Sequence, residues 1–274
     1  MLADSPLPAS IATPGAPSNL TELRAVTRAI EARGEGESGA TRRLPFGIAA
    51  IDDRLGGGLA LGALHEVAAP SPALADDAAA SLFAAGIAAR AHHDAAALHP
   101  RPVLWALAQP DLYAPGLAQA GLPPSRLLCA EGGDDACRLA LAEDALNDGS
   151  VAAVVVEVRA APMVATRRLH LAARAAGIPV LLLKRWRRCG ADPLALPSAA
   201  ASRWRIAPAR SERLPVMGVA RARWQVDCVR LRGGDPFSLV VEACDETGRI
   251  AVPAAARDRA TAARTARVRS LRAA

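Results

Sequence analysis

Residues 62–91 read GALHEVAAPSPALADDAAASLFAAGIAARA, and this stretch points most directly to the fold class. An apolar strand is predicted over 62–68. A proline-containing turn follows, and an alanine-rich helix is predicted over 76–91. A strand, a turn and a helix in this order form one βα unit, which predicts a sheet with helices packed on its faces.

Outward from this unit, apolar strands alternate with helices. Further strands are predicted over 102–108, 126–129, 151–158 and 180–183, and helices over 111–120, 134–147 and 162–176. Continuous apolar strands separated by helices indicate a parallel sheet that is covered on both faces. Later segments are typical of half-exposed antiparallel strands: 203–206, 224–231, 238–243 and 249–252. The expected fold is therefore α/β, with a mostly parallel sheet flanked by helices and antiparallel strands at its C-terminal end.

The chain divides into five segments. We expect a flexible arm (1–18), an amphipathic helix (19–33), a linker (34–43), the α/β domain (44–252) and a basic tail (253–274). In the helix, apolar residues recur at helical spacing on one face: Leu20, Leu23, Val26 and Ile30. Such a helix docks either on its own domain or on a neighbouring molecule, and the sequence leaves both open.

The tail has no apolar face wide enough to pack, and it is rich in arginine: Arg257, Arg259, Arg264, Arg267, Arg269 and Arg272. A segment of this kind is usually a solvated end, and a basic helix that folds on a partner is the common alternative. Helix 19–33 and the tail are the expected partner surfaces, because neither belongs to the core of the α/β domain.

The composition limits the classes of protein that remain. Hydrophobic residues make up 51% of the chain, so it can bury a core. Five cysteines without a CxxC or Cys/His ligand pattern predict neither a zinc site nor a disulfide framework. No apolar run reaches the roughly 18–20 residues of a membrane span, and MLADSPLPAS at the N-terminus lacks the pattern of a signal peptide. We expect a cytoplasmic protein without a membrane partner, whose net charge of +6 permits contact with nucleic acid.

The turn at 68–77, AAPSPALADD, lies where a βα unit of this kind would carry a phosphate-binding P-loop. A P-loop needs glycines, whose backbone N–H groups wrap the phosphate, and a lysine that bridges the terminal phosphates. This turn has neither, and Pro70 and Pro72 remove two N–H donors. Asp76 and Asp77 place negative charge at the start of the helix, where it would repel a phosphate. We therefore expect no nucleotide at this turn.

Several stretches resemble RecA-type recombinases. They are FGIAAIDDRLGGGL (46–59) before the strand LHEV (64–67), AQAGLPPSRLL (118–128), VVVE (154–157), SRWRI (202–206) and VRLR (229–232) followed by Pro236 and Phe237. Together they extend over most of residues 44–252. Within that superfamily the chain is most similar to the ImuA family, the degenerate RecA-like accessory proteins of the bacterial SOS mutasome. This similarity rests on the LHEV strand, the missing lysine and the arginine- and tryptophan-rich end with RGGDP (232–236).

The resemblance implies a degenerate nucleotide site made of Ala69, Pro70, Asp76, Asp77, Gln109, Glu157, Arg230 and Arg232. Gln109 stands in the place of the glutamate that activates water, and an amide cannot accept a proton at neutral pH. Glu157 stands in the place of the metal-linked carboxylate. Arg230 and Arg232 stand where recombinases reach with lysines into a neighbouring subunit's nucleotide. The resemblance therefore implies that hydrolysis is lost, with no catalytic residue, no metal and no cofactor.

The function that the resemblance implies is non-enzymatic. Members of this family join the mutasome by binding ImuB, an inactive homologue of Y-family polymerases, and through it the error-prone replicative-type polymerase and the sliding clamp. The protein would support translesion synthesis after DNA damage, associate with the nucleoid when engaged, and also contact RecA or single-stranded DNA. The alternatives are a SulA-type inhibitor of cell division and a RecA-like protein that binds ATP or single-stranded DNA.

A basic cluster with one aromatic ring follows the strand at 180–183: Lys184, Arg185, Trp186, Arg187 and Arg188. Cations beside a ring are typical of single-strand binding, and the carboxyl edge of a parallel sheet is where α/β folds place their sites. The cluster is thus a candidate contact for DNA or a partner, and a solvated loop is the alternative. Trp204 and Trp224 instead share a strand face with apolar residues, which predicts core positions.

Overall fold

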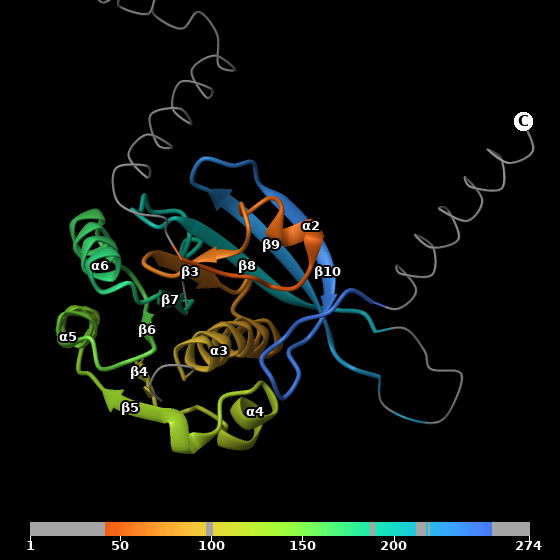
Figure 1. The fold of residues 1–274 in the computed structure, drawn as a ribbon, viewed down its shortest axis with the longest axis horizontal. Helices are drawn as coiled ribbons and strands as arrows, with labels where there is room; N and C mark the ends of the chain where they lie inside the picture. The colour runs from red at the N-terminus through yellow and green to blue at the C-terminus, as the bar shows by residue number, and fades with distance from the viewer. Residues whose placement is uncertain (1–41, 97–100, 187–189, 212–217, 219, 254–274) are drawn as a thin grey trace, which may run out of the picture. The chain divides into compact units, whose positions relative to one another are not determined.

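A computed structural model describes residues 42–96, 101–186, 190–211, 218 and 220–253 (Figure 1). The expected arm and amphipathic helix, most of the linker, and all but the first residue of the basic tail lie outside these residues, as do Arg187 and Arg188. No helix within the described ranges is long and apolar enough to cross a membrane.

One eight-stranded sheet organises the described domain. From one edge to the other it runs β10 (Phe237–Glu242), β9 (Arg223–Leu231), β8 (Ser202–Ala209), β3 (Leu64–Ala68), β7 (Val180–Lys184), β6 (Ala153–Val158), β4 (Val103–Leu107) and β5 (Leu127–Glu131). Pairing is parallel from β8 to β5 and antiparallel for β8–β9 and β9–β10. This confirms the predicted α/β class, with a mostly parallel sheet and C-terminal antiparallel strands, and it is consistent with a RecA-like fold.

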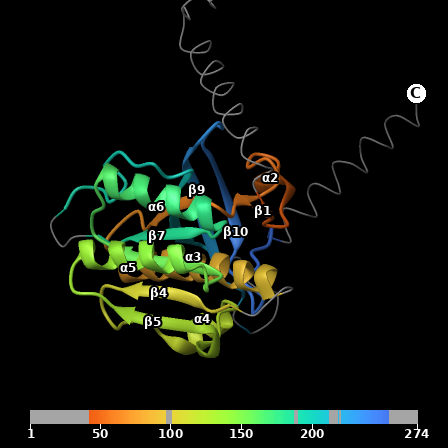
Figure 2. The same cartoon turned by 60° about the vertical axis from the view of Figure 1, so that its left-hand side comes forward.

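Helices cover both faces of the sheet (Figure 2). The helices are α2 (Ala49–Asp52), α3 (Leu74–Ala96), α4 (Ala114–Gln119), α5 (Asp135–Asp148) and α6 (Met163–Ala176), with a 3₁₀ turn at Pro124–Arg126. On one face α3 packs over the sheet, and on the other α5 and α6 lie side by side. The short strands β1 (Arg43–Leu44) and β2 (Leu59–Ala60) form a separate antiparallel pair.

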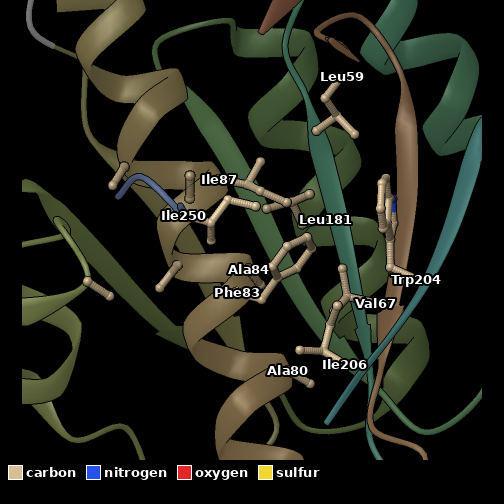
Figure 3. Packing of buried hydrophobic residues seen from close by; sticks show 14 of the residues in the cluster. Leu59, Val67, Ala80, Phe83, Ala84, Ile87, Leu181, Trp204, Ile206 and Ile250 are labelled. Carbon is tan, nitrogen blue, oxygen red and sulfur yellow. The ribbon is translucent and has the colours of Figure 1, made fainter. Parts of the chain in front are cut away.

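The core on the α3 face is built around aromatic side chains. The ring of Trp204 lies 5.9 Å from that of Phe46, 5.8 Å from that of Phe83 and 5.7 Å from that of Phe237, measured between centroids. Trp224 lies 6.3 Å from Phe83 on the same basis. Figure 3 shows Phe83 of α3 among apolar side chains of the sheet. The prediction that Trp204 and Trp224 are core residues is therefore confirmed.

Of the expectations about the C-terminal strands, one is incomplete and one is wrong. β8 pairs antiparallel with β9 as predicted, but it also pairs in parallel with β3 and so joins the two parts of the sheet. The segment 249–252 forms a single bridge, Glu242 to Ala251, rather than a strand. The chain turns at Gly248, with a φ of 74°, and Ile250 enters the core beside α3. Burial of this residue against the helix outweighs the strand preference of the segment.

Candidate functional site

A cleft of about 780 Å³ opens at the carboxyl edge of the parallel strands. It is lined by Pro72, Leu74, Asp77, Ala108, Gln109, Asp111, Glu157, Arg159, Arg185 and Trp186. Open α/β sheets place their ligands at this edge, and the volume falls in the range of small-molecule pockets. The cleft therefore occupies the place of a nucleotide site.

Side chains of the turn between β3 and α3 form hydrogen bonds within the turn itself. The Ser71 hydroxyl donates to Asp76 Oδ2 at 2.5 Å and accepts from the N–H of Ala73 at 3.2 Å. Pro70 and Pro72 supply no N–H donors. Two of the N–H groups that could bind a phosphate are thus missing from the turn, and a third is already occupied.

Arg185 lines the cleft and pairs there with three carboxylates. Its guanidinium pairs with Asp77 at the start of α3, and its Nη2 donates to Glu157 Oε1 at 2.8 Å and to Asp111 Oδ1 at 3.2 Å. Burial alone would lower the pKa of Arg185, but Glu157, followed by Asp77 and Asp111, holds that pKa above its ordinary value. One cation that follows β7 therefore ties together α3, β6 and the segment after β4. We call Arg185, Asp77, Asp111 and Glu157 the arginine hub.

Both oxygens of the buried Glu157 carboxylate accept hydrogen bonds from the protein. Oε1 accepts from Trp105 Nε1 at 2.9 Å in addition to Arg185, and Oε2 accepts from the N–H of Ala108 at 3.1 Å. A metal ion would have to displace these donors. Within the described ranges, no group of His, Cys, Asp or Glu side chains has the geometry to hold a metal.

Two more predicted residues lie at the cleft. Trp186 is half-buried, and its Nε1 donates to the carbonyl of Ala69 at 2.8 Å. Gln109 is exposed in the wall of the cleft. The structure therefore gathers Ala69, Pro70, Asp76, Asp77, Gln109 and Glu157 at or beside the cleft.

Arg230 and Arg232 do not join this cleft. They lie at the end of β9, where Arg203 pairs with Arg230 and Ser202 with Leu231, level with the amino end of β3. The Arg230 guanidinium donates to the carbonyl of Ser198 at 2.9 Å. Arg230 and Arg232 therefore lie at the amino edge of the parallel strands, opposite the cleft. A contact of these arginines with the nucleotide site of a neighbouring subunit stays a prediction.

The prediction that Lys184 contacts DNA or a partner is wrong. Its side chain is fully buried, with Nζ 2.9 Å from Glu66 Oε1, while Glu66 Oε2 accepts from Arg203 Nε at 2.6 Å. Successive side chains of a strand point to opposite faces of the sheet, so Lys184 and Arg185 enter different networks. Arg185 and Trp186 are likewise held by contacts at the cleft.

Sequence reasoning missed the role of Arg185 as the internal cation of the cleft, and it did not name Asp111, Arg159 or Trp105. The one local signal was an arginine directly after an apolar parallel strand. Around the cleft, three carboxylates face the guanidiniums of Arg185 and Arg159. This balance favours a cationic group over a triphosphate, because added anions would meet the carboxylates.

These features define the class of the protein as an α/β domain consistent with a RecA-like fold, with an ion-paired arginine at the carboxyl edge of its parallel strands. The chain belongs to the ImuA family. It is 39% identical over 206 residues to Protein ImuA of Caulobacter vibrioides strain NA1000 / CB15N, an alignment that covers 73% of this chain and 83% of the relative. Protein ImuA of Caulobacter vibrioides strain ATCC 19089 / CIP 103742 / CB 15 gives the same values. No protein-family model matches the chain.

Proposed function

We propose that this chain is a non-catalytic component of an ImuA/ImuB mutasome, which supports error-prone translesion synthesis after DNA damage. The observation that supports a non-catalytic role is the arginine hub, which pairs Arg185 with carboxylates beside the turn between β3 and α3. Membership of the ImuA family supports the assembly. The protein contributes binding surfaces, and the chemistry of DNA synthesis belongs to its partners.

The charge of the cleft supports the absence of nucleotide binding. A triphosphate would have to break the contacts of Arg185 with Asp77 and Glu157 before it could use that guanidinium. It would then leave the buried Glu157 carboxylate without its counter-ion. Removing one partner of a buried ion pair costs about 3–5 kcal/mol, and Pro70 and Pro72 deprive this turn of two N–H donors that would offset that cost.

The proposed direct partner is an ImuB-type polymerase homologue. Through it the chain would reach the error-prone replicative-type polymerase and the sliding clamp, with RecA and single-stranded DNA as further contacts. Helix 19–33 and the tail remain the proposed partner surfaces, and both lie outside the described residues.

Nucleotide binding is tested on the full chain by its melting temperature in millimolar ATP and Mg²⁺. A ligand present at about 100 times its dissociation constant adds roughly 2.7 kcal/mol of stability. We expect no shift, whereas an active RecA recombinase in the same buffer should shift clearly. A shift and ATP hydrolysis by this chain would overturn the non-catalytic proposal.

Partner binding is tested by co-purifying the full chain with the ImuB-type homologue. We expect a complex. We also expect Leu23→Asp together with Ile30→Asp to weaken it, and likewise the combination Arg264→Glu, Arg267→Glu and Arg269→Glu. A complex that survives both sets of changes would exclude helix 19–33 and the tail as the partner surfaces. The absence of any complex with the unaltered chain would contradict the proposed assembly.

A further inference from the structure

The outer face of α6 exposes apolar side chains that the fold leaves uncovered. Of the eight large apolar residues that are exposed in the described part of the chain, four lie on α6 or the loop 190–201: Met163, Val164, Leu171 and Leu196. Val164 is 71% exposed and Leu171 is 56% exposed. Their spacing of seven residues puts both on one helix face, about 10 Å apart.

The same helix carries only positive charge. Its sequence, MVATRRLHLAARAA, contains Arg167, Arg168 and Arg174 and no acidic residue. Arg168 pairs with Glu143 of α5 at 2.7 Å and remains 65% exposed. Arg167 and Arg168 stand between Val164 and Leu171 in the sequence, so cations flank the apolar stripe.

The loop beside α6 is fixed by the domain, so this surface is already formed. The N–H of Ala199 donates to Thr166 Oγ1 on α6 at 3.2 Å, and Arg203 Nη2 donates to the carbonyl of Leu196 at 2.7 Å. Arg205 and Asp192 form an ion pair at the start of the loop. Figure 1 shows α6 beside α5, on the side of the sheet that faces away from α3. A preformed surface lowers the entropy that binding has to offset.

We propose that this α6 face docks an amphipathic helix with acidic flanks, carried by the polymerase homologue of the mutasome. The inference rests on the proposed function for the identity of that partner. Val164 and Leu171 would contact the partner's apolar stripe, and Arg167 and Arg168 would face its carboxylates. Helix-on-helix recognition uses apolar anchors at this spacing, and peripheral charges set the choice of partner.

Two other occupants fit the face less well. The helix predicted over 19–33 would have an apolar stripe, but this segment contains three arginines and two glutamates, so its net charge has the same sign as that of α6. Nucleic acid would pair with the arginines, but a phosphate backbone does not cover two exposed aliphatic side chains. An acidic amphipathic helix satisfies both the charge and the apolar stripe.

The test measures the affinity of the full chain for the purified polymerase homologue. Val164→Asp together with Leu171→Asp should weaken binding roughly tenfold or more, because both changes put a charge into an apolar contact. Arg167→Glu with Arg168→Glu should also weaken it. Val240→Asp on β10, also an exposed apolar position, is the matched control and should change the affinity less than about twofold. All of these positions are exposed, so an unchanged melting temperature verifies folding.

The outcomes separate this inference from the proposed function. If the unaltered chain binds the homologue and the α6 variants bind equally well, only the α6 inference fails. If the unaltered chain does not bind it, the proposed function fails and the α6 inference fails with it. Faster hydrogen exchange in α6 after Leu23→Asp with Ile30→Asp would assign the face to helix 19–33 and overturn the inference. Loss of oligo-dT binding in the α6 variants, with partner affinity unchanged, would assign it to DNA instead.

Discussion

Arg185 joins carboxylates that come from separate parts of the chain. Asp77 belongs to the first turn of α3, Asp111 to the segment after β4, and Glu157 to β6. Glu157 is fully buried, so its charge is tolerated because a guanidinium and two N–H donors face it. A side chain of the protein thus neutralises carboxylates from three parts of the chain at the cleft, and we expect the local structure to depend on it.

Replacing Arg185 by alanine should destabilise the fold by about 3 kcal/mol, because it leaves Glu157 as a buried charge without its cation. The free energy of unfolding in urea measures this effect. Arg168→Ala is the control, because the Arg168–Glu143 pair is largely exposed and should contribute less than about 1 kcal/mol. Equal losses for the two variants would mean that the arginine hub is not a structural replacement for a ligand.

Lys184, the only lysine of the chain, should resist amine-reactive reagents in the folded protein. Its ammonium group is fully buried against Glu66, so a reagent reaches it only when the chain unfolds. Mass spectrometry of the peptide containing Lys184 should show no modification in buffer and full modification in urea. Rapid labelling in buffer would contradict the burial of this side chain.

At the scale of elements, the packing of α3 depends on close approach by the segment after β10. A Cβ atom on Gly86 would lie 2.2 Å from Cys244 Sγ and 3.1 Å from the carbonyl oxygen of Gly248. Glycine at this position lowers the helix propensity of α3, but it permits the segment that contains Cys244 and Gly248 to lie against the helix. This contact replaces the strand that sequence periodicity predicted over 249–252.

Gly86→Ala should lower stability by about 1–3 kcal/mol, because overpacking exceeds the roughly 1 kcal/mol that alanine gains as a helix former. Thermal unfolding shows whether the variant is less or more stable than the unaltered chain. Gly133→Ala is the control, because nothing lies within 4 Å of its Cβ position. The double variant Gly86→Ala with Cys244→Ala should recover part of the lost stability, because it removes the sulfur atom that the new methyl group would contact. A Gly86→Ala variant that is more stable than the unaltered chain would show that the segment after β10 does not pack tightly against α3.

At the scale of the whole molecule, a buried histidine links the small sheet to the large one. His65 Nε2 donates to the carbonyl of Ala60 at 2.8 Å, and its Nδ1 accepts from the Ser202 hydroxyl at 2.7 Å. The Ser202 oxygen in turn accepts from Trp204 Nε1 at 2.6 Å. This chain of donors holds the histidine in its neutral form, and burial lowers the pKa of His65 from 6.5 to about 4.

The stability of the whole fold should therefore fall as the solution is acidified. Since the folded pKa lies below the unfolded one, the contribution of His65 is complete above pH 6.5 and is lost as the pH falls toward 4. The loss is about 3 kcal/mol, because one unit of pKa corresponds to about 1.4 kcal/mol. Urea unfolding at pH 7.5 and pH 4.5, compared between the unaltered chain and His65→Gln, isolates this contribution. Equal pH dependence in both would contradict it.

Local patterns in the sequence determined the class of fold and the residues of its core. Alternating apolar strands and helices predicted a mostly parallel sheet, and the apolar neighbours of Trp204 and Trp224 on their strands predicted their burial. The sequence alone also shows that residues 68–77 contain neither the glycines nor the lysine of a P-loop. Such features depend on neighbours along the chain, which periodicity reports directly.

Only the tertiary structure decided how the charges pair. Lys184 and Arg185 are adjacent and looked equivalent, yet one is buried against Glu66 and the other holds the cleft through Glu157 and Asp77. The sites of Arg230 and Arg232 were likewise settled by the direction of β9, which carries them to the edge opposite the cleft. The physical reason is that an ion pair joins residues far apart along the chain. Its partners are therefore chosen by strand order and by the face to which each side chain points.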